Sequence, residues 1–204
     1  MNRIHHWLCR SDRWRKTVAR RLHWALAATD LGDCVLELGP GPGLTTDLLR
    51  ARVPHLAAIE INPSLAESLR CRLSSNNVTV ITGDAVAMPF PTARFSAVVC
   101  FTMLHHLPSA ALQDKLLREV RRVLRPGGIF GGCDSLQGLY MRLIHIGDIF
   151  VPVDPDTFPE RLEAAGFEAA HVEKNSEAFR FQARRPLSAR TELDQSVKLE
   201  GARP

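Results

Sequence analysis

Glycines at alternate positions, with an acidic residue just before them, mark the segment of this chain most capable of chemistry. The apolar run Val35–Leu38 contains Glu37, and Gly39, Gly41 and Gly43 follow it. Glycine allows a sharp turn and lets a ligand lie against the main chain. A dinucleotide-binding loop has the spacing G-x-G-x-x-G, whereas here the third glycine comes one residue early. A carboxylate inside the strand disfavours a phosphate and favours a ligand with a cationic ammonium or sulfonium group.

Two further acids follow predicted strands. Glu60 ends the second strand, and Asp84 follows Gly83 after the third. Because open α/β sheets bind ligands at the carboxyl ends of their strands, we expect these acids to lie near Glu37. A carboxylate at the position of Glu60 can accept hydrogen bonds from both hydroxyls of a ribose. The three acids therefore predict a site for a ligand with a ribose, an adenine amine and a positive charge. Asp84 also has the alternative of being an ordinary turn residue.

Strands and helices that alternate along the chain must position these groups. The pattern predicts strands at Cys34–Leu38, His55–Ile61, Asn77–Ile81, Phe95–Phe101 and Ile129–Cys133, with helices at Leu44–Val53, Pro63–Leu73 and 112–124 between them. Such alternation predicts a parallel sheet with helices on both faces. Pro126, Gly127 and Gly128 are expected to stop the third of these helices.

The end of the domain is predicted to differ from the rest. A last helix is expected at Thr157–Ala165, with Thr157 as its cap and Gly166 closing it. Strands at Ala169–Lys174 and Ala178–Arg184 have only three residues between them, which forces an antiparallel hairpin. The predicted fold is α/β, with a doubly wound, seven-stranded, mostly parallel sheet and an antiparallel hairpin at its C-terminal end.

Charge divides the chain into three parts. Residues 1–28 are predicted to form a basic N-terminal helical arm, 29–185 the domain, and 186–204 a flexible tail. Within residues 1–24, seven basic side chains face one acidic one, so the pI of about 9.0 belongs to the arm. The near-neutral remainder makes nucleic acid an unexpected partner for the domain as a whole. The arm itself has three interpretations: a solvated helix, a cover over the substrate, or a contact with a membrane surface or nucleic acid.

Cysteine usage and hydropathy bear on the compartment. The five cysteines are scattered and form no C-x-x-C pair, which disfavours a zinc site and a disulfide framework. No apolar run approaches the roughly 20 residues that a transmembrane helix needs, and no signal peptide is recognisable. We therefore expect a cytoplasmic protein without a transmembrane segment. The oligomeric state is not predicted.

Five segments in order carry a family resemblance, which spans about residues 30–185. Val35–Gly43, Ala58–Asn62, Gly83–Ala85, Phe101–Leu107 and Leu124–Gly128 resemble the motifs of the class I S-adenosylmethionine-dependent methyltransferases, in particular the small-molecule enzymes of methyltransferase type 11. The resemblance implies a Rossmann-like fold and S-adenosyl-L-methionine as cofactor.

The resemblance also implies cofactor-binding roles, residue by residue. Glu37 and the loop with Gly39, Gly41 and Gly43 would hold the methionine end, and Glu60 would hold the ribose. Ile61 would lie against the adenine, Asp84 and Ala85 would meet its amine and ring, and Phe101 would border the transferred methyl group.

The acceptor side is less defined. Its wall is expected within Asp134–Val153, and no catalytic residue is assigned; the candidates are His105, His106, Tyr140, His145 and Asp148. No metal is expected, because no H-E-x-x-H motif or third ligand accompanies the histidine pair.

Several acceptor classes stay open. The segment Leu104–Leu107 resembles small-molecule methyltransferases, and phospholipid N-methyltransferases share its style. Val35–Asp84 also resembles the ribosomal RNA adenine dimethylases, but their N-P-P-Y-like motif is absent after the fourth strand. A small-molecule acceptor is therefore the leading hypothesis, with a phospholipid or nucleic-acid methyltransferase, or a non-catalytic protein that keeps the fold, as alternatives. A nicotinamide oxidoreductase is disfavoured by the glycine spacing.

Overall fold

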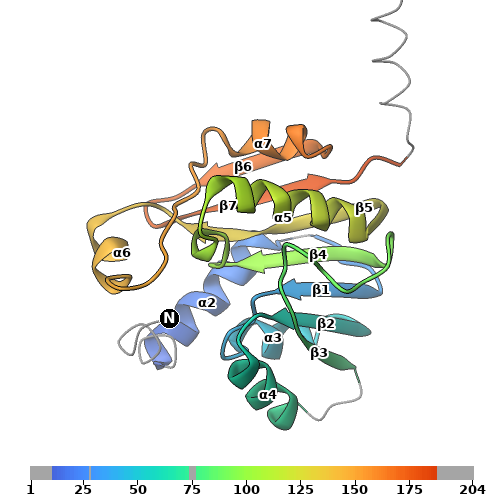
Figure 1. The fold of residues 1–204 in the computed structure, drawn as a ribbon, viewed down its shortest axis with the longest axis horizontal. Coiled ribbons are helices and arrows are strands. Elements are labelled where there is room, and N and C mark those ends of the chain that lie inside the picture. The colour runs from blue at the N-terminus through green and yellow to red at the C-terminus, as the bar shows by residue number, and fades with distance from the viewer. Residues whose placement is uncertain (1–10, 28, 74–76, 188–204) are drawn as a thin grey trace, which may run out of the picture.

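The computed structural model describes residues 11–27, 29–73 and 77–187 of the chain. Its centre is a seven-stranded sheet: β1 (Cys34–Leu38), β2 (His55–Glu60), β3 (Val78–Thr82), β4 (Phe95–Phe101), β5 (Leu124–Ser135), β6 (Glu168–Lys174) and β7 (Ala178–Arg184). The strand order is β3-β2-β1-β4-β5-β7-β6 (Figure 1). The first five strands pair in parallel, and β7 runs antiparallel to both of its neighbours. The predicted fold, including the terminal hairpin, is confirmed.

Helices cover both faces of this sheet. One face carries α2 (Asp12–Ala25), α3 (Leu44–Leu49) and α4 (Pro63–Arg72), and the other carries α5 (Ala110–Val123) and α7 (Phe158–Ala164). The core has two layers, one on each face of the sheet. Neighbouring residues of β4 show this, because Val98 belongs to the layer under α5 and Val99 to the layer under α2. The short helices η1 (Leu104–His106) and α6 (Leu139–Ile144) lie in the connections that follow β4 and β5.

Several predicted elements differ from the observed ones, and the helix expected at Leu44–Val53 already ends at Leu49. The strand expected from Ile129 begins at Leu124, because the amide of Gly127 and the carbonyl of Gly128 both bond to Arg185 after β7. The helix α5 thus ends at Val123, ahead of Pro126, and the two glycines lie inside the strand that follows. Thr157 lies at the start of α7 as expected, but its hydroxyl donates to the carbonyl of Asp154 at 3.5 Å and does not bond the helix.

The described part of the predicted arm is a layer of the domain. The hydroxyl of Ser11 accepts from the amide of Trp14 at the start of α2, and Leu22 and Leu26 are buried against the sheet. Arg21 donates to the hydroxyl of Ser135 at the end of β5, at 3.0 Å. The helix is therefore fixed over the carboxyl end of β5. The beginning of the predicted arm and nearly all of the predicted tail lie outside the described residues.

Two observations on the described residues concern membrane-spanning helices and the state of the cysteines. Within those residues no helix is long and apolar enough to cross a bilayer. Cys34, Cys71, Cys100 and Cys133 are free thiols.

Candidate functional site

The loop after β1 depends on glycine at each of its three positions. Gly39, Gly41 and Gly43 have φ values of 60°, 54° and 83°, a region that other residues rarely adopt. A Cβ on Gly39 would lie 2.5 Å from Cγ of Met103, and one on Gly43 would lie 2.3 Å from Cδ1 of Leu69. At Gly39 and Gly43 the backbone therefore packs closely against neighbouring side chains. The positive φ values confirm the sharp turn that the glycine pattern predicted.

Two charged side chains hold this loop in place. The carboxylate of Glu60 accepts from the amide of Gly41 at 3.0 Å and from the amide of Asn62 at 2.9 Å. The guanidinium of Arg72 donates to the carbonyl of Pro42 at 3.2 Å and to both carboxylate oxygens of Asp47. A carboxylate has about four lone-pair positions, so Glu60 can still accept from the two hydroxyls of a ribose.

Glu37 lies behind the loop and is fully enclosed. Its carboxylate accepts from the hydroxyls of Thr45 and Thr46 in the first turn of α3, the second of these at 2.6 Å. Burial raises the pKa of Glu37 to about 7, although the two hydroxyl hydrogen bonds act to lower it. The residues that line the cavity described below include Thr45 but not Glu37. The contact of Glu37 with the methionine end of a cofactor therefore stays a prediction.

A cavity of about 670 Å³ brings most of the predicted residues together at the carboxyl ends of the parallel strands. Its lining includes Gly39, Gly41, Glu60, Ile61, Asp84, Ala85 and Phe101 from the predicted cofactor side, and His105, His106, His145 and Asp148 from the acceptor candidates. Gly43 shapes the loop but is not part of the lining. Tyr140 belongs to α6, and its side chain lies outside the described part of the chain.

The wall next to Phe101 contains a residue that the sequence did not single out. Thr102 has a φ of 51°, in the left-handed region, and its amide donates to the carbonyl of Cys133 at 2.8 Å. A threonine in this conformation costs about 1–3 kcal/mol. Such strain is found more often at binding sites than elsewhere, and Thr102 lines the cavity.

A buried hydrogen bond between a histidine and a carboxylate supports the histidine side of the cavity. Nδ1 of His105 lies 2.5 Å from Oδ1 of Asp134, whose other oxygen accepts from the backbone amide of His105 at 3.2 Å. Both side chains are almost completely enclosed. Burial acts to raise the pKa of Asp134, but the charge and hydrogen bonds of His105 and the amide of Ser135 bring it below its ordinary value. The carboxylate thus fixes the orientation of the imidazole.

A third histidine lies beside the pair, so the reason for expecting no metal, the absence of a third ligand, does not hold in the folded chain. One ring nitrogen from each of His105, His106 and His145 lies within 4.8 Å of the others. The ring centroids of His105 and His106 are 4.3 Å apart, and each lies 5.1 Å from that of His145. No sequence pattern indicated this approach, because His145 belongs to the connection between β5 and α7, which folds back onto η1.

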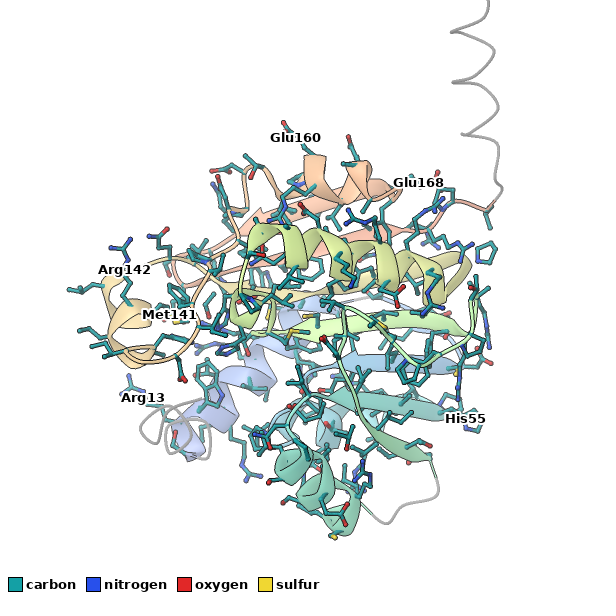
Figure 2. The ribbon with its side chains drawn as sticks, viewed as in Figure 1. Arg13, His55, Met141, Arg142, Glu160 and Glu168 are labelled. Carbon is teal, nitrogen blue, oxygen red and sulfur yellow. The ribbon has the colours of Figure 1, made fainter. Side chains whose placement is uncertain are left out.

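The rest of the acceptor wall is mostly apolar. It is formed by side chains from α2, η1, α5, α6 and the following connection: Trp14, Val18, Leu107, Leu112, Met141, Ile144 and Ile149. In Figure 2, Met141 lies at one end of the sheet, and His55, the first residue of β2, lies at the other. The described part of the arm therefore contributes to the cavity through Trp14 and Val18.

Comparison with known proteins relates this chain to methyltransferases. The chain matches the family described as a methyltransferase domain over residues 36–131. A probable ribosomal RNA small subunit methyltransferase A of Thermococcus onnurineus is 37% identical over 105 residues, which is 47% of this chain and 39% of that protein. A sterol 24-C-methyltransferase of Gibberella zeae is 29% identical over 177 residues, or 78% of this chain and 46% of that protein. The chain thus spans less than half the length of these two relatives.

Solved structures share the fold at low identity. The methyltransferase of a complex with the Haloferax volcanii Trm112 activator superposes with a TM-score of 0.71 at 18% identity, over 91% of this chain and 99% of that one. A Haemonchus contortus phosphoethanolamine N-methyltransferase, solved with phosphomonomethylethanolamine and S-adenosylhomocysteine, gives 0.70 at 14% identity, over 90% and 56%. These structures establish the fold.

Proposed function

We propose that this chain, which contains a class I S-adenosylmethionine-dependent methyltransferase domain, methylates a small and largely apolar molecule. One observation carries the proposal: a single cavity of about 670 Å³ joins the glycine loop and strand-end acids to an apolar wall. Sites for small ligands typically measure about 300–1,000 Å³ and are mostly apolar with a few polar groups. The sterol methyltransferase that matches 78% of this chain supports an apolar acceptor.

The donor would lie along the ends of β1, β2 and β3. Glu60 would accept from the ribose hydroxyls, since it already lies at the cavity wall with lone pairs to spare. Asp84 would accept from the adenine amine, with Ile61 and Ala85 against the ring. The loop from Gly39 to Gly43 and Phe101 would border the methionine end.

The reaction places modest demands on the protein. When bound, S-adenosylmethionine supplies a methyl group on a sulfonium; a lone pair of the acceptor attacks the methyl carbon in line, and the sulfur leaves with the electrons of the broken C–S bond. The residues need to align the acceptor and exclude water. Trp14 and Val18 of α2 and Met141 of α6 would do this from the side opposite the loop. For an O–H or S–H acceptor, His106 is the base candidate with the more exposed side chain of the His105–His106 pair.

A second candidate function is methylation of a lipid headgroup or RNA, which the ribosomal RNA methyltransferase relatives favour. The exposed basic side chains Arg13, Arg15, Lys16 and Arg20 on α2 offer a surface for it. Replacing Arg13, Arg15 and Lys16 by glutamate tests this candidate. The small-molecule proposal predicts unchanged activity, whereas loss of binding to RNA or anionic vesicles together with loss of activity would favour the second candidate.

In either case, the free thiols lead us to propose a reducing compartment such as the cytoplasm.

The direct experiment is methyl transfer from labelled S-adenosylmethionine to a panel of small acceptors. The panel would contain apolar alcohols, phenols, thiols and amines, with RNA and phospholipid vesicles beside them. The proposal predicts labelled product from an apolar small molecule, and no product with Glu60→Ala at the same cofactor concentration. Label that enters only RNA or phospholipid would contradict it.

A further inference from the structure

We propose that His105, His106 and His145 form a binding site for a divalent transition metal of the zinc type in the acceptor half of the cavity. Zinc sites that take part in catalysis commonly have three protein ligands and an open fourth position. All three histidines line the cavity, and one ring nitrogen from each lies within 4.8 Å of the others. A metal among them would face the cavity with its fourth position.

Hydrogen bonds behind the rings determine which nitrogen faces the metal. Nδ1 of His145 lies 2.7 Å from the carbonyl oxygen of Met141. Because a carbonyl only accepts, Nδ1 must carry the hydrogen, and a neutral ring then has its lone pair on Nε2. Nδ1 of His105 is bound to the carboxylate of Asp134 in the same way. Metal-binding histidines almost always donate their other nitrogen to a carboxylate or a backbone carbonyl, and His105 and His145 do so here.

The segments that carry these two rings are also well supported. The side-chain amide of Gln113 donates to the carbonyl of Leu104 at 3.2 Å and to that of Val151 at 2.9 Å. The amide of Val151 in turn donates to the carbonyl of His105 at 2.8 Å. The ring of His145 stacks on Phe150, with centroids 4.7 Å apart. Both rings are therefore held from behind, whereas His106 is only half-buried.

The observed spacing is close to that of a metal site. Tetrahedral zinc with bonds of about 2.0–2.1 Å sets its ligand nitrogens about 3.3 Å apart. The three nitrogens lie within 4.8 Å, so they must approach each other by at most about 1.5 Å. Rotation of the half-buried His106 side chain would supply most of this movement.

The role of such a metal rests on the proposed function. An oxygen or sulfur of the acceptor would occupy the fourth position, and the positive charge would lower the pKa of its O–H or S–H group. With His106 as a ligand and not as the base, the proton would leave to water before methyl transfer, and the freed lone pair would form the bond to the methyl carbon while the C–S bond of the donor breaks. The acceptor class is then an alcohol, a phenol or a thiol, and an amine is disfavoured.

Zinc binding to the whole 204-residue chain tests the site. The protein carries no affinity tag, and His5 and His6 are replaced by alanine in every sample because adjacent histidines bind metal by themselves. After dialysis against Zn²⁺, we expect one zinc per chain. His106→Gln and His145→Ala should each lose it, whereas His171→Ala, which removes an exposed histidine of β6, should retain it. Thermal melting without zinc verifies that each variant is folded.

A positioning residue gives a finer test. Asp134→Asn keeps all three ligands but removes the negative charge behind His105, and loss of such a partner typically weakens metal binding about 10–100-fold. The metal site would be overturned if the parent chain, in which only His5 and His6 are replaced, fails to bind zinc, or if His106→Gln and His145→Ala bind as much zinc as that parent. The same samples are melted with S-adenosylhomocysteine. A melting shift without zinc binding overturns the metal site alone, and zinc binding without a shift overturns the proposed function alone.

Discussion

The two halves of the cavity are built in different ways. The donor half follows the ends of adjacent strands, and backbone groups define it: three glycines with positive φ and the amides of Gly41 and Asn62 that bond Glu60. The acceptor half is assembled from side chains far apart in the sequence, such as Trp14, His105 and His145. A backbone-defined site suits a donor that is the same in every reaction. A site made of side chains can change its acceptor without altering the fold.

The largest expected effect concerns the backbone of the donor half. Gly43→Val puts a β-branched residue at a φ of 83°, with its Cβ 2.3 Å from Leu69. Backbone strain and overpacking together should lower the free energy of unfolding by about 4 kcal/mol. Gly41→Ala is the control, since its φ is also positive but its Cβ meets open space, and it should cost about 1 kcal/mol. Urea unfolding measures both, and equal costs would show that close packing does not matter at Gly43.

The next largest effect is a pH dependence of the free energy of unfolding. It arises from Glu37, which is buried behind the loop of the donor half. Burial raises the pKa of Glu37 from an ordinary 4.5 to about 7, so the folded state holds a proton that the unfolded state releases. This stabilisation is complete below about pH 4.5 and is lost as the pH rises through about 7. Relative to Glu37→Gln, the wild type should lose about 3 kcal/mol of unfolding free energy between pH 4.5 and 7.5.

The control for this experiment is Glu160→Gln, at an exposed position of α7. It should follow the wild type across the whole pH range. Parallel curves for Glu37→Gln and the wild type would mean that Glu37 titrates at an ordinary pKa despite its burial.

A smaller effect distinguishes the contribution of Trp14 to the cavity wall from the overall packing of α2. Trp14→Ala removes an aromatic wall of the cavity and should raise the KM for the acceptor about tenfold, equivalent to about 1.4 kcal/mol, while leaving affinity for S-adenosylhomocysteine within about twofold. Trp24, on the same helix, is also half-buried, packs against Arg180 and is not part of the lining. Trp24→Ala should therefore leave the acceptor KM unchanged. If both variants change KM equally, α2 acts through its overall packing and not through the cavity wall.

The smallest effect concerns the expected adenine contact. Ile61 is 67% exposed, so Ile61→Ala should change the free energy of unfolding by less than about 0.5 kcal/mol. Affinity for S-adenosylhomocysteine should fall about fivefold, because about 1 kcal/mol of apolar contact is lost. Ile146, which is 69% exposed and not part of the lining, is a matched control. Calorimetric titration of Ile146→Ala should give the wild-type affinity.

The difference between the backbone-defined donor half and the acceptor half made of side chains also explains what could be predicted from the sequence. The glycines revealed the loop because positive φ leaves a trace in residue type, and Glu60 and Asp84 were visible because each follows a strand pattern. The contact between Asp134 and His105 and the approach of His145 left no such trace, since they depend on how the connection after β5 folds back. Thr102 adopts a left-handed φ with an ordinary residue type, so no pattern could identify it. Glu37 was found, but its enclosure by Thr45 and Thr46 required the position of α3.

The most direct test of the account is a pair of melting experiments with S-adenosylhomocysteine, on Glu60→Ala and His106→Ala. A ligand at a hundredfold excess over its Kd stabilises a protein by about 2.7 kcal/mol, which at this size is a shift of several degrees. If the donor occupies the strand ends and the acceptor the histidine side, the shift should be lost in Glu60→Ala and kept in His106→Ala. A shift that is lost in both variants, or kept in both, would contradict the division of the cavity into two halves.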